Sequence, residues 1–201
     1  IALNGGEDIL LAYQPIGPNI ILLAELIQNH PSVKFATIVD HEDAVNQLSS
    51  SMQNARLNLR VRIDVDCGMH RTGIPFGKSL NALRALIEQK EGLEYEGLHV
   101  YDGHLHQPDT ETRRHETENV IRQVETYDNE HSAGVVVGGG SPTFQFWAEN
   151  TSWECSPGTT LFWDMGYSTA FPELPYAIAV ALLTRVISKP GRDLFCVDCG
   201  Y

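Results

Sequence analysis

The sequence lacks any apolar run long enough to cross a bilayer, which takes about 18 consecutive residues. It also lacks a basic segment followed by a short apolar one at its start, so no secretory signal is predicted. Basic residues are few, since 14 Lys and Arg stand against 26 Asp and Glu and the formal net charge is −12. Nucleic acids and anionic membranes are bound through basic surfaces, so we expect neither, and we expect a small-molecule partner.

Cysteine is scarce as well, with four residues: Cys67, Cys155, Cys196 and Cys199. A chain of 201 residues with 42% apolar and 20% charged residues can bury a large core without disulfide staples. Reduced thiols and a cytoplasmic location are therefore expected. The last two cysteines form a C-x-x-C pair, which could suit redox or zinc chemistry, but no second pair accompanies it. We favour ordinary thiols in a terminal strand.

Short β-branched runs alternate with longer helical patterns, which is the rhythm of βα units in a parallel sheet. Strands are predicted over residues 9–13, 34–39, 60–65, 97–101, 134–137 and 160–163. Helices are predicted where apolar residues recur at three-and-four spacing, over residues 19–29, 41–54, 79–89 and 110–129. The fold class is therefore α/β. Periodicity alone leaves two architectures open, an open doubly wound sheet and most of a (β/α)8 barrel.

The position of polar residues favours the TIM barrel, because a barrel gathers its site in many βα loops whereas an open sheet uses one switch point. Such residues follow nearly every predicted strand: Gln14, Asp40, residues 66–71, 102–106 and 138–143, and Asp164. Beyond them, prolines, an alternating stretch over 177–187 and a further strand indicate a β-rich region. We predict part of a barrel over residues 1–170 and the start of a C-terminal β domain over 171–201, both cut from a longer protein.

A turn that presents one arginine follows the third predicted strand. The strand passes through Asp64 and Asp66 into a glycine-bracketed segment that carries Arg71. A guanidinium fixed at a strand end suits a carboxylate, a phenolate oxygen or a ring nitrogen of a ligand. The alternative is a solvent-facing arginine paired with one of the two aspartates, and the local sequence weighs these two equally.

The fourth predicted strand ends in a stretch with three histidines and a tyrosine, His99-Val100-Tyr101-Asp102-Gly103-His104-Leu105-His106. Alternation puts His99 and Tyr101 on one face, so Tyr101 is expected to point into the barrel mouth. Its ring can stack on a planar cofactor, and a neighbouring histidine can carry a proton near neutral pH. The alternatives are a core role for His99 and helix capping by His104 or His106. A metal site is only weakly indicated here.

Two loops with glycines come later in the chain, Gly138-Gly139-Gly140-Ser141-Pro142-Thr143 and Ser156-Pro157-Gly158-Thr159. Bare backbone lets amides approach an oxyanion closely and hydroxyls add donors, so we predict a phosphate cup, as barrels often have near their last two strands. No lysine follows in the register of a P-loop, and the dinucleotide fingerprint is incomplete. A plain tight turn is the alternative for the first loop.

In this order the segments resemble the metal-activated D-threonine aldolase and D-serine dehydratase group, pyridoxal-phosphate enzymes with a barrel of the alanine-racemase type. The resemblance runs from residues 8–13 through the segments above to residues 198–201. It implies pyridoxal 5′-phosphate as cofactor, a small amino acid as substrate and a homodimer. It also implies a divalent metal (Mn, Mg or Zn) whose ligands lie in the β domain beyond Tyr201.

By this resemblance Arg71 lies beneath the cofactor, near its ring nitrogen or phenolate side, and Tyr101 lines or stacks on the pyridine ring. The phosphate is then surrounded by the two loops, through Gly139, Gly140, Ser141, Thr143, Gly158 and Thr159. His106, or else His104, faces the substrate hydroxyl. An arginine near the ring nitrogen disfavours its protonation and weakens the electron sink. In the family's aldolases a divalent metal near that hydroxyl assists its deprotonation, and the Cα–Cβ bond breaks to glycine and an aldehyde.

Two departures from the family pattern stand out. The lysine that holds the cofactor lies upstream of Ile1, and no lysine of the chain has a matching context; Ser156 stands where related barrels often carry arginine. We expect residues 1–201 alone to form no covalent bond with the cofactor and to be inactive. The predicted function is a lyase for D-3-hydroxy amino acids, of the D-threonine aldolase kind. The alternatives are a D-serine dehydratase, an amino-acid racemase, a non-catalytic cofactor-binding protein and a barrel fragment without a ligand.

Overall fold

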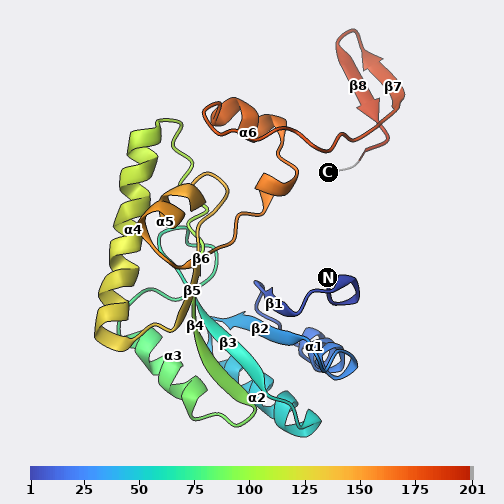
Figure 1. The fold of residues 1–201 in the computed structure, drawn as a ribbon. Helices are drawn as coiled ribbons and strands as arrows, with labels where there is room; N and C mark the ends of the chain where they lie inside the picture. The colour runs from blue at the N-terminus through green and yellow to red at the C-terminus, as the bar shows by residue number, and fades with distance from the viewer. Residues whose placement is uncertain (200–201) are drawn as a thin grey trace. The chain divides into compact units, whose positions relative to one another are not determined.

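The computed structural model describes residues 1–199, so Gly200 and Tyr201, the end of the predicted resemblance, lie outside the described residues. The chain forms two compact units (Figure 1). The first runs from Ile1 to Pro157 and the second begins at Gly158. Compact units need not coincide with domains. The predicted boundary between the barrel and the C-terminal β domain, at residue 170, therefore stays a prediction.

Six parallel strands form the sheet of the first unit, and each pairs with the next one along the chain. This is the strand order of a barrel wall, whereas a doubly wound sheet reverses its order at a switch point. The strands are β1 (Asp8–Leu11), β2 (Lys34–Val39), β3 (Leu59–Val65), β4 (Leu93–Val100), β5 (Val135–Gly138) and β6 (Glu154–Cys155). The first unit is a curled half-barrel of parallel strands with connecting helices, which confirms the predicted α/β fold class (Figure 1).

Helices connect the strands of the wall. They are α1 (Pro18–Asn29), α2 (Glu42–Ala55), α3 (Lys78–Glu88), α4 (Thr110–His131) and α5 (Phe144–Asn150). The four helices predicted from apolar periodicity are confirmed to within a few residues, while the short α5 was not expected. No helix among the described residues has both the length and the apolarity that spanning a bilayer requires.

The two faces of the wall bury different side chains. On β3, Val61, Ile63 and Val65 share the face that packs into the apolar core with residues of the helices. The intervening positions carry charge: Glu96 of β4 lies 2.5 Å from Arg60 and 2.7 Å from Arg62. Barrel interiors are usually filled by branched apolar side chains, so this ion-paired layer is a departure from the common pattern.

The predicted strand over residues 160–163 is wrong. Residues Thr159–Leu161 form a 3-10 helix (η2), and Trp163 has a φ of 50°, which a strand cannot accommodate. The sixth strand is β6 instead, where Glu154 and Cys155 pair with Val137 and Gly138 of β5. The apolar residues 161–163 have strand propensity, but they form no strand because no neighbouring strand pairs with them.

The second unit contains η2, a short helix α6 (Met165–Ala170) and an antiparallel pair, β7 (Val186–Gly191) and β8 (Leu194–Val197). The rings of Trp163 and Tyr176 lie 4.9 Å apart, and those of Trp163 and Tyr167 lie 5.2 Å apart, which gives this unit a small aromatic cluster. The alternating stretch over 177–187 does not form a strand until Val186. The further strand predicted after it is confirmed as β8.

Candidate active site

Asp66 shapes the turn that carries Arg71. Its Oδ1 accepts hydrogen bonds from the backbone N–H groups of Gly68 and His70, each 3.0 Å long, and its Oδ2 lies 2.7 Å from Nδ1 of His70. Burial raises the pKa of the Asp66 carboxyl, but the hydrogen bonds from His70 and Gly68 outweigh that effect and hold the pKa below its usual value. Asp66 is therefore engaged by the turn itself.

Asp64 joins the inner face of the wall to the same turn. Its Oδ1 lies 2.7 Å from Nδ1 of His99, and its Oδ2 accepts a 2.7 Å hydrogen bond from Thr72 Oγ1. Both Asp64 and His99 are buried, so His99 has the core role given above as its alternative. Within the described part of the chain, Asp64 and Asp66 contact the imidazoles of His99 and His70, and neither carboxylate forms an ion pair with Arg71. The alternative of an arginine paired with these aspartates is not what the structure contains.

Arg71 lies against Tyr101. Its guanidinium carbon is 4.8 Å from the centre of the Tyr101 ring. Glycines lie at the two opposite edges of this ring: a Cβ on Gly103 would lie 2.2 Å from Cε1, and a Cβ on Gly140 would lie 3.3 Å from Cε2. Arg71, Tyr101 and the loop of Gly140 and Ser141 thus meet where β3, β4 and β5 end. The predicted convergence of these three segments is present in the structure.

Asp102 organises the glycine loop, a role that the sequence did not suggest. Its Oδ1 accepts hydrogen bonds from the Gly140 N–H at 2.8 Å and from Thr143 Oγ1 at 2.9 Å, and its Oδ2 accepts one from Trp147 Nε1 at 2.9 Å. The Gly140 amide and the fully buried Thr143 hydroxyl, both predicted to face a phosphate, donate to this carboxylate. An acid beside Tyr101 was visible in the sequence, but its partners lie 38 to 45 residues away.

The two loop histidines differ in their surroundings. The His104 ring covers Gly68, because a Cβ there would lie 2.8 Å from His104 Nε2, and the φ of 129° at Gly68 also favours glycine. His104 therefore reaches the turn of Arg71. Both histidines are exposed, and the backbone N–H of His106 donates to the His104 carbonyl at 3.1 Å. The substrate-facing role of His106 stays a prediction.

The remaining predicted residues and ligand types are placed as follows. Gly158 and Thr159 belong to the second unit, so their part in a phosphate cup stays a prediction. Across residues 1–199, no group of three or more His, Cys, Asp or Glu side chains is arranged to hold a metal ion. The cysteines of the described chain are free thiols, and burial raises the pKa of Cys67 to about 12, with a further contribution from the charge of Asp102.

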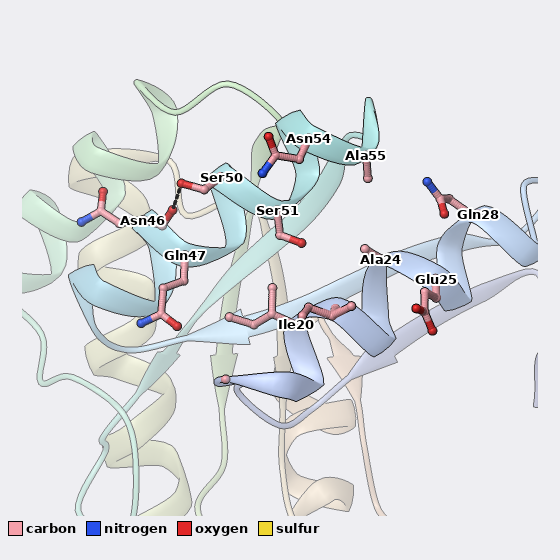
Figure 2. A pocket seen from close by; sticks show the side chains of 12 residues that line it. Ile20, Ala24, Glu25, Gln28, Asn46, Gln47, Ser50, Ser51, Asn54 and Ala55 are labelled. Carbon is pink, nitrogen blue, oxygen red and sulfur yellow. Dashed lines mark hydrogen bonds between the residues drawn. The ribbon is translucent and has the colours of Figure 1, made fainter.

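A groove of about 690 Å³ lies elsewhere, between α1 and α2 (Figure 2). Neutral polar side chains of α2 face Ile20 and Ala24 of α1 across it, and Ser50 Oγ donates to the Asn46 carbonyl at 2.9 Å. None of the predicted site residues lines this groove. The candidate site therefore lies where Arg71 and Tyr101 meet, and this groove is separate from it.

Residues 15–165 match the family described as alanine racemase, N-terminal domain. The chain belongs to this family. Among relatives, this alanine racemase-family chain is 26% identical over 206 residues to D-threonine aldolase of Arthrobacter sp, covering 98% of this chain and 54% of the relative. It is 25% identical over 214 residues to 3-hydroxy-D-aspartate aldolase of Paracoccus denitrificans (strain Pd 1222), covering 99% and 55%. The chain thus spans about half the length of these curated relatives.

Solved structures agree with this family assignment. The crystal structure of D-threonine aldolase from Filomicrobium marinum superposes with a TM-score of 0.81 at 25% identity, covering 98% of this chain and 55% of that one. Alanine racemase from Bacillus anthracis superposes with a TM-score of 0.65 at 20% identity, covering 85% and 42%, and this likeness shows the fold alone. The resemblance drawn from the motifs is confirmed at the level of the family.

Proposed function

We propose that the protein containing this chain is a pyridoxal-phosphate-dependent lyase that cleaves D-3-hydroxy amino acids to glycine and an aldehyde. The relatives named D-threonine aldolase and 3-hydroxy-D-aspartate aldolase, each matched over nearly the whole of this chain, support it. The observation that carries the proposal is that the Tyr101 ring lies 4.8 Å from the guanidinium carbon of Arg71 and also borders the loop that contains Gly140 and Ser141.

The residues at the mouth fit a phosphorylated heterocycle. Arg71 makes no ion pair with Asp64 or Asp66, so its charge is open to a phenolate oxygen or a ring nitrogen. The bare α-carbon of Gly140 lets the loop approach Tyr101 to van der Waals distance. When bound, pyridoxal phosphate would supply an electron sink for the pair left on the substrate Cα.

The predicted site residues differ in their roles toward the cofactor and the substrate. Arg71 orients the ring by charge, and Tyr101 lines it. Ser141 and the amide of Gly139 bind the phosphate, while Gly140 and Thr143 hold the loop in shape through Asp102. His106 or His104 holds the proton of the substrate hydroxyl, since histidine exchanges protons near neutral pH.

Other parts of the proposal rest on the longer protein. The lysine that binds the cofactor, the ligands of a divalent metal and the partner subunit of a homodimer would come from outside residues 1–201. The shared length of about half of each aldolase relative leaves room for all of them. Residues 1–201 alone are expected to bind the cofactor at most reversibly.

The full-length protein should be assayed with D-threonine, D-3-hydroxyaspartate and D-serine, with the L-enantiomers as controls. We expect glycine and an aldehyde from the D-3-hydroxy substrates. Replacing Arg71 by alanine should weaken cofactor binding as well as turnover. Pyruvate and ammonia as the main products would indicate a dehydratase, mixing of enantiomers would indicate a racemase, and cofactor binding without turnover would indicate a binding protein. Any of these results contradicts the proposal.

A further inference from the structure

Arg113, in the first turn of α4, is fully buried. A cation at this end of a helix is unfavourable, because the helix dipole is positive there, and burial removes the water that would stabilise its charge. The preceding Asp109 already caps the helix, since its Oδ1 accepts the Thr112 N–H at 2.8 Å. Capping therefore gives no reason for a guanidinium at this position.

The guanidinium of Arg113 instead bonds to backbone carbonyls of two different loops. Nη1 donates to the Gln107 carbonyl at 2.5 Å, in the loop that follows β4. Nε donates to the Pro142 carbonyl at 3.1 Å, in the loop that follows β5. The side-chain Oε1 of Gln107 is buried and has no hydrogen-bond partner among the described residues. The amide oxygen of Gln107 thus adds nothing to the hold on its own loop.

These two carbonyls stand directly after His106 and Ser141 in the chain. We infer that Arg113 is a positioning residue that ties the loop of His106 to the loop of Ser141, so that the substrate side and the phosphate side of the mouth keep a fixed spacing. The assignment of those two sides rests on the proposed function. The link between the loops over residues 103–109 and 139–143 follows from the hydrogen bonds of Arg113 alone and does not depend on the function.

The tie can be tested by hydrogen–deuterium exchange on the full-length protein without added cofactor. Arg113→Lys keeps the charge, but the single nitrogen of an ammonium cannot occupy the positions of both Nε and Nη1, which donate to separate loops. We expect exchange in both segments, 103–109 and 139–143, to accelerate at least about tenfold, as follows from losing a hydrogen bond to a charged group. Residues 34–39 of β2 should exchange as before. The matched control is Arg114→Lys, the adjacent arginine, which bonds to Glu149 at 2.7 Å and to neither loop.

Unchanged exchange in either segment would contradict the inference that Arg113 links the two loops. Equal acceleration across residues 1–157 would also contradict it, because it would show that Arg113 stabilises the whole unit and not these loops in particular. If the lysine variant does not fold, Arg113→Gln offers two donors without charge and is judged by the same comparison. A second readout concerns function: Arg113→Lys should lower the affinity for pyridoxal phosphate more than that for pyridoxal. Because the exchange experiment needs neither cofactor nor turnover, its outcome is independent of whether the protein is a lyase.

Discussion

The carboxylate of Asp64 and the imidazole of His99 form a buried hydrogen bond, with 2.7 Å between Oδ1 and Nδ1. The two residues are register partners on β3 and β4, and the second oxygen of Asp64 accepts from Thr72, the neighbour of Arg71. One carboxylate thus connects the inner face of the wall to the turn that presents the arginine. Removing this carboxylate should therefore destabilise both the inner face of the wall and the turn of Arg71.

Replacing Asp64 by leucine should destabilise the protein by about 3 kcal/mol or more, because it leaves the donors of His99 and Thr72 without their shared acceptor. Urea denaturation followed by circular dichroism measures this loss. Asp43→Asn is the control, since the Asp43 side chain is 76% exposed and its loss should change stability by less than about 0.5 kcal/mol. A similar effect of both variants would contradict a central role for Asp64.

Replacing Asp102 by asparagine should loosen the glycine loop. The amide oxygen can still accept from Gly140 and Thr143, but the amide nitrogen then faces the N–H of Trp147, so two donors oppose each other. We expect a loss of about 1–3 kcal/mol in the free energy of unfolding and a weaker affinity for pyridoxal phosphate.

Asp109→Asn is the matched control for Asp102→Asn, because asparagine caps a helix about as well as aspartate. It should leave both the free energy of unfolding and the cofactor affinity close to those of the parent. If Asp102→Asn also left the free energy of unfolding and the cofactor affinity unchanged, this would contradict the hydrogen bonds described between Asp102 and the glycine loop.

Replacing Gly103 by alanine should displace the Tyr101 ring without altering the tyrosine itself. The new Cβ would lie 2.2 Å from Tyr101 Cε1, closer than nonbonded atoms approach. In the full-length protein, affinity for pyridoxal phosphate and turnover should fall together. Gly191→Ala is the control, since its Cβ would make only an ordinary contact with Leu194. Unchanged cofactor affinity in Gly103→Ala would rule out contact between Tyr101 and the cofactor.

Cys67 should resist thiol reagents. With its pKa raised by burial to about 12, only about one thiol in ten thousand is ionised at pH 8, and the thiolate is the reactive form. Cys196 is exposed and should react first with 5,5′-dithiobis(2-nitrobenzoate). Peptide mapping after partial reaction identifies the modified residue. Labelling of Cys67 as fast as Cys196 would contradict the burial of this thiol beside Asp102.

Asp8 should contribute stability that is lost in acid. A hydrogen bond from Arg60 lowers the pKa of Asp8 below its ordinary value of 3.8, although burial opposes the shift. Since the folded pKa lies below the unfolded one, the stabilisation is present above the unfolded value and disappears as the pH falls through the folded one. Urea denaturation at a series of pH values should show a smaller loss of stability in this acidic window for Asp8→Asn than for the parent. Parallel curves would contradict it.

Much of the wall was predictable because its signals are local. The runs at residues 34–39 and 60–65 are β-branched and bounded by turn residues, and α2 repeats its apolar positions at helical spacing. The meeting of Arg71 with Tyr101 was also predictable, because the carboxyl ends of adjacent parallel strands lie at one edge of a sheet.

What the sequence did not reveal depends on contacts between distant residues. Glu154 and Cys155 form a strand because β5 offers them an edge, whereas the more apolar residues 160–163 have no such neighbour. The three donors that converge on Asp102 likewise become visible only when the loops after β4 and β5 are brought together. Neither the pairing of β6 with β5 nor the hydrogen bonds to Asp102 can be predicted from local sequence.

The sequential strand order has a consequence for how this protein is made. Because each strand of the wall pairs with the one that precedes it in the chain, every new βα unit finds its docking edge already synthesised. The entropy lost in closing each loop is that of a few tens of residues, and this cost grows only slowly with loop length. The wall can therefore assemble progressively as the polypeptide leaves the ribosome.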